Sequence, residues 1–362
     1  MRVFGFLVAI VLLMAAGPLQ ASAAERWIES WGTPQPLAPP PPSPFSGSDG
    51  DAAPPPRAPF AAYPRSFTDQ TIRMIVRTSA GGSRFRLEFA NIHAGETVAF
   101  GAVHAALAGP PGTTVPGTDR AVTFGGKPNL TLFPGARAVS DPVELALPPL
   151  TEVAVSIYVP HWAPAGTVDP LALMPTYIAD GNQAAAVELD ERGIAGAYFW
   201  LRGLSVETAD ARAGTIVALG DSITEGYATT AGAHRSWPAL LAERLQRDPA
   251  LASWGVVNAG ISGNRVLRPG AGDAMLARLD ADVLTRPGVE WVIVLAGIND
   301  INMSIMPGMP PEQAATAEDI IVGLGQLAAR ARLYGIKVAG GTVMATKGLP
   351  FYSQEGERMR QA

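Results

Sequence analysis

Residues 215–227 read Thr-Ile-Val-Ala-Leu-Gly-Asp-Ser-Ile-Thr-Glu-Gly-Tyr, and this stretch decides how the rest of the chain is interpreted. The continuously apolar run from Ile216 to Leu219 is typical of a parallel strand buried on both faces. Gly220 permits a sharp turn, and the residues after it can begin a helix whose first backbone N–H groups lack internal partners. At this position, Ser222 would lie beside amide donors able to stabilise an oxyanion. A helix-capping role for Ser222 explains the pattern equally well, so other residues must decide.

Strands and helices are expected to alternate after Ala213. We expect strands at 215–219, 255–258, 291–296 and 336–339, and helices near 237–247, 273–284 and 312–334. This alternation predicts an α/β domain over residues 213–362, with a parallel sheet covered on both faces and ligands at the carboxyl ends of its strands. Ser222 lies at one of these ends.

Two further loops leave strands at the same predicted edge. Asn258-Ala259-Gly260-Ile261-Ser262-Gly263-Asn264 follows the second strand, and Gly297-Ile298-Asn299-Asp300 follows the third. Each loop alone is compatible with an ordinary turn, because Gly, Asn and Asp are common turn formers. Together they offer a glycine N–H and an asparagine amide that could join the Ser222 N–H around an oxyanion.

The three segments resemble those of the SGNH, or GDSL-type, esterase and lipase family. Gly220-Asp221-Ser222-Ile223-Thr224 is similar to the family's nucleophile segment, 258–263 to its glycine segment, and 297–300 to its Gly-x-Asn-Asp segment. The resemblance covers about residues 213–347. It implies a parallel, flavodoxin-like, three-layer domain and an enzyme that hydrolyses carboxylic esters without a metal or organic cofactor.

The resemblance also implies roles for individual residues. Ser222 is the implied nucleophile, and its own N–H, the Gly263 N–H and the Asn299 side chain form the implied oxyanion hole. Gly260 is a second candidate for the glycine position. Asp221 is implied to shape the turn, and Asp300 to orient the loop that carries Asn299.

The chain departs from the family pattern in its general base. The family carries this base on a late Asp-x-x-His segment, whereas the last histidine here is His234, in a position that is not catalytic in the family. The final residues, 355–362, resemble the opening of an amphipathic helix. We therefore expect the domain to be C-terminally incomplete and this chain to be nearly inactive, because losing the base of a serine triad costs about a million-fold in turnover.

The region before the α/β domain predicts a second domain rich in strands. Phe85, Leu87 and Phe89 alternate with polar residues, as in a half-buried strand, and several such segments favour a β-sandwich over 66–205. The family resemblance extends to this region, which is similar to the accessory domain of one secreted branch. We interpret it as a structural partner rather than a carbohydrate-binding module. Residues 24–65 are expected to form an N-terminal segment with a proline-rich linker, in which Trp27 and Trp31 pack against the next domain.

Residues 1–23 are typical of a secretory signal peptide, with Arg2, an apolar run and a small-residue cleavage site. An uncleaved anchor is the competing interpretation, but the run is shorter than the roughly 20 residues that span a bilayer. We expect a secreted or periplasmic protein without a membrane span in its mature form.

Composition removes several other classes. The absence of cysteine excludes disulfides and thiolate chemistry, and a net charge of −5 without basic runs argues against nucleic acid as a partner. The histidines at 93, 104 and 161 share no metal-ligand spacing. Nucleotide binding is disfavoured because no glycine-rich phosphate loop follows a strand.

The sequence thus predicts a secreted serine esterase that acts on small esters with short acyl or acetyl groups, including acylated carbohydrate. The alternative is an inactive fragment or pseudoenzyme that binds carbohydrate through its β domain. Oligomeric state has no signal in the sequence.

Overall fold

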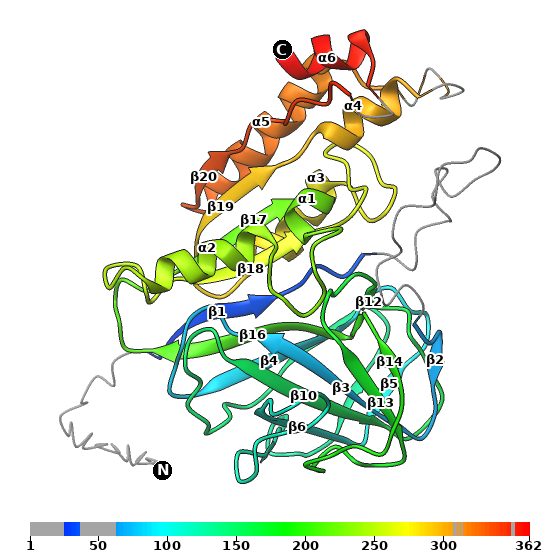
Figure 1. Ribbon diagram of the computed structural model, residues 1–362, viewed down its shortest axis with the longest axis vertical. Helices are drawn as coiled ribbons and strands as arrows, with labels where there is room; N and C mark the ends of the chain where they lie inside the picture. Colours follow the sequence, from blue (N-terminus) through cyan, green and yellow to red (C-terminus); the bar gives the residue numbers. More distant parts are fainter. Residues whose placement is uncertain (1–24, 37–62, 307–309, 311, 313, 349–351) are drawn as a thin grey trace, which may run out of the picture.

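The computed structural model describes residues 25–36, 63–306, 310, 312, 314–348 and 352–362 (Figure 1). The predicted signal peptide and most of the proline-rich segment lie outside the described residues. Two parts lie side by side in Figure 1: a β-rich domain, and an α/β domain that carries the described C-terminal end. The fold class predicted from the sequence is confirmed.

The β-rich domain consists mainly of two antiparallel sheets. The strands of the four-stranded sheet lie in the order β1 (Arg26–Gly32), β16 (Leu201–Thr208), β4 (Phe85–Asn91) and β9 (Ala136–Val139). The six-stranded sheet has the order β14 (Glu191–Ala195), β13 (Thr176–Asp180), β3 (Gln70–Arg77), β10 (Glu152–Val159), β6 (Ala102–Leu107) and β7 (Arg120–Ala121). Three two-stranded pairs complete it: β2 (Ser66–Phe67) with β11 (Ala163–Pro164), β5 (Val98–Phe100) with β8 (Leu130–Leu132), and β12 (Val168–Asp169) with β15 (Tyr198–Phe199).

One hydrophobic core joins the two main sheets. Phe85, Leu87 and Phe89 of β4 are fully buried in it, together with Ile72 of β3 and Val155 of β10. The alternation seen in the sequence of β4 therefore does point one set of side chains into a shared core, as in a sandwich.

The limits of the β-rich domain differ from the predicted division. Residues 26–32, which the sequence assigns to a segment before the domain, form β1 and pair antiparallel with β16, and β16 itself runs to Thr208. Ile28 is buried in the sandwich core, and the Trp31 ring meets the Tyr198 ring edge to face at 5.0 Å. Pairing across some 180 positions of sequence is invisible to local patterns, which explains the difference.

The α/β domain is built on a parallel sheet in the order β18 (Gly255–Gly260), β17 (Thr215–Gly220), β19 (Val289–Leu295) and β20 (Lys337–Gly340). Its helices are α1 (Ser222–Glu225), α2 (Trp237–Gln246), α3 (Met275–Leu279), α4 (Ile298–Ser304), α5 (Ala317–Leu333) and α6 (Gln354–Gln361), with a π-helical segment at Asp280–Leu284 after α3.

Helices cover both faces of this sheet. Val217 and Leu219 pack with Leu279 of α3 and Leu327 of α5, whereas Val256 packs with Leu245 of α2. The continuous apolar run of β17 follows from this, because a strand between two helical layers buries both sets of side chains.

Two predicted helices differ in detail. The helix predicted over 312–334 begins only at Ala317, because Thr316 and Asp319 form a capping box in which each side chain bonds the other residue's backbone N–H. The helix predicted over 273–284 begins at Met275 and loosens into the π-helical segment.

A buried charge network crosses between the two domains. The Arg286 guanidinium, which follows the π-helical segment, donates to the Glu29 carboxylate of β1 at 2.7 Å, and both side chains are almost fully buried. Arg202 of β16 lies 4.0 Å from Asp282 across the same boundary. Ser79 adds a neutral link, because its Oγ accepts from the Val256 N–H at 2.7 Å on the outer strand β18.

Within the described ranges, no helix has both the length and the apolarity needed to cross a bilayer.

We expect Arg286→Met to lower the free energy of unfolding by about 3–5 kcal/mol, because Glu29 would keep a buried charge without its closest partner. Urea denaturation at pH 7 measures this. The matched control is Arg192→Met, which removes an exposed pair with Asp180 and should leave the free energy of unfolding nearly unchanged. Equal losses in the two variants would contradict a special role for the buried pair.

Candidate active site

The three predicted loops start at one edge of the parallel sheet. Gly220, the last residue of β17, pairs in register with Gly260 at the end of β18 and with Leu295 at the end of β19. Ser222, Gly263 and Asn299 follow these three ends within two to four residues. The strands thus bring the three predicted site segments to a common edge.

Ser222 is the first residue of α1, a helix of a single turn. Asp221 is its N-cap and accepts a hydrogen bond from the Ile223 N–H at 3.0 Å, so capping belongs to Asp221 rather than Ser222. A Cβ at Gly220 would lie 2.0 Å from the Thr224 hydroxyl, which requires glycine there. The Ser222 side chain is partly exposed and free of the cap.

The two glycines proposed for the second segment differ in their contacts. The Gly260 N–H donates to the Asn258 side chain at 3.0 Å, and a Cβ at Gly260 would lie 2.2 Å from the Glu225 nitrogen. Gly260 thus lets α1 pass close over β18. Gly263 is exposed with a left-handed φ of 77°, and no hydrogen-bond partner of its N–H lies among the described residues. These contacts favour Gly263 as the available donor.

Asn299 is the second residue of α4, and its side chain faces the loop after β18. Its Nδ2 donates one hydrogen bond to the Asn264 carbonyl at 3.0 Å. Since an amide nitrogen carries two hydrogens, one remains for a ligand. Asp300 accepts from the Val266 and Leu267 N–H groups at 2.8 and 3.1 Å, so it fastens this loop to α4.

Two carboxylates near the nucleophile segment are energetically unfavourable in their charged forms. The pKa of Asp221 is raised to about 6, mainly by burial and in smaller part by the nearby Asp300 charge, while the hydrogen bond from the Ile223 N–H and the Arg278 charge oppose the shift. The Asp221 Oδ2 is buried and has no hydrogen-bond partner among the described residues. Burial also raises the pKa of Asp300. Both groups shape the site instead of facing solvent.

Several residues that hold the site together were not predicted from the sequence. Glu225, at the end of α1, accepts from the Ser262 N–H at 2.6 Å and from its hydroxyl. Arg278 of α3 donates to the backbone carbonyls of Gly220 and Ala259. The sequence signal that could have identified Arg278 is Asp282, four residues later. Oppositely charged residues at this spacing lie on the same face of a helix and can pair.

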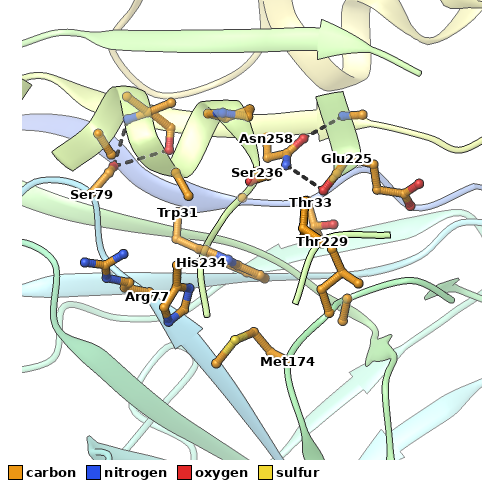
Figure 2. A pocket seen from close by; sticks show the side chains of 18 of the residues that line it. Trp31, Thr33, Arg77, Ser79, Met174, Glu225, Thr229, His234, Ser236 and Asn258 are labelled. Atoms are coloured by element: carbon orange, nitrogen blue, oxygen red, sulfur yellow. Dashed lines mark hydrogen bonds between the residues drawn. The ribbon is translucent and has the colours of Figure 1, made fainter. Parts of the chain in front are cut away.

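His234 faces the β-rich domain. Its Nε2 lies 2.8 Å from a Glu152 oxygen on β10, and this contact lowers the pKa of Glu152. Both domains line the adjacent pocket of about 130 Å³, which includes His234, Glu225 and Asn258 but not Ser222 (Figure 2). The structure therefore pairs this histidine with Glu152.

The remaining histidines lie in the β-rich domain, where His93 bonds the Gln35 carbonyl and His104 pairs with Asp119. Within the part of the chain that the structure describes, no group of three or more His, Asp or Glu side chains could hold a metal ion.

Residues 218–362 match the model of the GDSL-like Lipase/Acylhydrolase family. A curated relative, thioesterase 1/protease 1/lysophospholipase L1 of Escherichia coli K12, is 40% identical over 90 residues. That match covers 25% of this chain and 36% of the relative, so the chain spans about a third of the length of the relative it matches.

Solved structures show a weaker likeness. The acetylxylan esterase Axe2 of Geobacillus stearothermophilus is 22% identical with a TM-score of 0.32, over 41% of this chain and 70% of that one. LAE5, an alpha/beta hydrolase from the metagenome of Lake Arreo in Spain, is 23% identical with a TM-score of 0.32, over 40% and 67%. At these scores neither structure carries an argument about substrate.

We expect Asp221→Asn to remove a pH dependence of stability. A carboxyl whose folded-state pKa exceeds its unfolded value stabilises the folded protein fully below its unfolded pKa of about 4, and that contribution is lost as the pH rises through about 6. Between pH 4 and 7 the native protein should therefore lose up to about 3 kcal/mol of unfolding free energy relative to the variant.

Urea denaturation at four pH values measures this difference. Asp319→Asn is the control with the opposite sign, because hydrogen bonds from Thr316 lower the pKa of Asp319. Its stabilising contribution is lost as the pH falls. Parallel pH profiles for the native protein and Asp221→Asn would show that this carboxyl is not strained.

Proposed function

We propose that this chain, whose residues 218–362 match the model of the GDSL-like Lipase/Acylhydrolase family, supplies the nucleophile and oxyanion hole of a serine hydrolase that cleaves carboxylic esters. The observation that supports this most is the register of β17, β18 and β19, whose ends lie side by side. Ser222, Gly263 and Asn299 follow those ends, and each of these residues is at least partly exposed.

In the proposed reaction, the Ser222 oxygen attacks the ester carbonyl and loses its proton to a general base. The tetrahedral intermediate places its negative oxygen against the N–H groups of Ser222 and Gly263 and the second N–H of the Asn299 amide. Protonation of the leaving oxygen releases the alcohol and leaves an acyl-enzyme. Water then attacks the acyl carbon and releases the acid.

The general base must lie within hydrogen-bond reach of the Ser222 oxygen. We assign it to none of the chain's four histidines, since His234 bonds Glu152 and the other three belong to the β-rich domain. Assays of this proposal use the full-length product of the gene that encodes the chain.

The substrate class that we propose is esters with short acyl groups, including acetyl groups carried on carbohydrate. We propose that the protein acts on them outside the cytoplasm. The support for export is the signal-peptide pattern of residues 1–23. Comparing 4-nitrophenyl acetate with its decanoate, and adding acetylated xylan, tests the acyl length and the carbohydrate part separately.

Ser222→Ala should lower kcat for 4-nitrophenyl acetate by about a million-fold, because the attacking oxygen is lost. Ser236→Ala is the control, since Ser236 begins α2 without a side-chain capping bond and should keep kcat within about twofold. Absorbance at 405 nm follows both. Unchanged hydrolysis by Ser222→Ala would refute Ser222 as the nucleophile, whereas no hydrolysis by the native protein would favour the carbohydrate-binding alternative.

Asn299→Ala should lower kcat by about 100- to 1,000-fold with little change in KM, because an oxyanion donor acts mainly in the transition state. Asn302→Ala, on the same helix, is the matched control. A rise in KM at constant kcat would instead assign Asn299 to ground-state binding.

A further inference from the structure

Arg278 contacts two of the three segments of the candidate oxyanion hole directly and reaches the third through Asn264. Its guanidinium donates to the Gly220 carbonyl at 3.0 Å, to the Ala259 carbonyl at 2.9 Å, and to the Asn264 side-chain oxygen at 3.0 Å. A fourth contact, at 2.8 Å, goes to the Asp282 carboxylate. The side chain is 5% exposed, so these partners replace water almost completely.

Each of the three neutral partners either lies within four residues of a candidate donor or accepts a hydrogen bond from one. Gly220 precedes the Asp221-Ser222 turn, and Ala259 is the second-last residue of β18, before the loop with Gly263. The backbone oxygen of Asn264 accepts the hydrogen bond from Asn299 at 3.0 Å. The Asn264 side chain also donates to the Asp273 carbonyl at 2.8 Å, so its amide is held at both ends.

We propose that Arg278 is the positioning residue of this oxyanion hole: its guanidinium clamps the ends of β17 and β18 and the residue that Asn299 bonds. This inference rests on the proposed function above. Arg278 touches backbone and side chains of the site but not the reacting atoms, so it acts through the three donors it aligns.

Only arginine fits these partners. Four acceptors lie around one planar group whose N–H donors point in fixed directions, whereas a lysine ammonium offers three donors from a single point. Burial lowers the pKa of Arg278, and the Asp282 carboxylate opposes that shift. The buried Asp282 carboxylate therefore stabilises the charged form of Arg278.

The clamp extends into the β-rich domain. Asp282 lies 3.8 Å from Arg286, and Arg286 donates to Glu29 of β1. A row of alternating charges thus runs from β1 to the ends of β17 and β18. Through Glu29, the β-rich domain hence helps to orient Arg278.

We expect Arg278→Met and Arg278→Lys to lower kcat for 4-nitrophenyl acetate by about 100-fold or more, with KM changed by less than about threefold. Arg278→Ala leaves room for an added ion, so methylguanidinium at low millimolar concentration should restore part of its kcat, and methylammonium should not. The measurements use the complete gene product at least 10 °C below each variant's Tm. If Arg278→Met does not fold, Arg278→Lys decides.

Arg73→Met is the matched control for losing a buried arginine. Arg73 is fully buried in the β-rich domain and donates to Ser156 and to the Gly112 carbonyl, far along the chain from the site. It should lose stability but keep its kcat within about twofold. A similar kcat loss in both variants would reduce Arg278 to a general stabiliser and overturn the proposal.

Hydrogen–deuterium exchange separates this inference from the proposed function. In Arg278→Met, peptides covering 218–224, 258–266 and 296–302 should exchange at least tenfold faster than in the native protein, with no such change in Arg73→Met. Native exchange in all three peptides would overturn the clamp even if the enzyme is active. Faster exchange with no Ser222-dependent hydrolysis would keep the clamp and reject the esterase.

Discussion

Parallel pairing of β17 with both of its neighbours is the constraint on which the site depends. Parallel strands leave their carboxyl ends at one edge, and the pairing of Gly220 with Gly260 and Leu295 brings three loops together, which then bond one another through Asn299 and Asp300. The loops then need only short local devices, such as the Asp221 cap and the left-handed Gly263. Backbone hydrogen bonds in the sheet thus do most of the positioning, and side chains refine it.

The β-rich domain fits the interpretation as a structural partner. Its first strand brings Glu29 into a buried interface with Arg286. Ser79 accepts a hydrogen bond from the Val256 N–H on the outer strand β18, where unpaired backbone groups would otherwise be open to association. Buried ion pairs add little net stability compared with apolar packing, but they tolerate few alternative arrangements. The interface is therefore suited to fixing the orientation of the two domains. Carbohydrate binding by this domain stays a separate hypothesis.

Local patterns in the sequence revealed the features that depend on neighbouring residues. The apolar run of β17 and the Gly-Asp-Ser turn predicted a buried strand and its exit, since both follow from a few consecutive side chains. The role of Arg278 could not be predicted in this way. Its guanidinium donates to the carbonyls of Gly220 and Ala259, which only the folded sheet brings within 3.0 Å of it. The pairing of β1 with β16 was missed for the same reason.

The carboxylates around Ser222 cannot simply be replaced by apolar residues, although their burial is unfavourable. Asp221 keeps a buried oxygen without a described partner, and burial raises the pKa values of Asp300 and Glu225 as well. An apolar residue at any of these positions would avoid the desolvation cost, yet each carboxylate accepts hydrogen bonds from a loop N–H that would then be left unpaired. The same groups that weaken the fold therefore hold the loops in place. Arg278 reduces this conflict for Asp221 and Glu225. Its buried guanidinium offsets part of their negative charge and also binds a carbonyl at the end of β17.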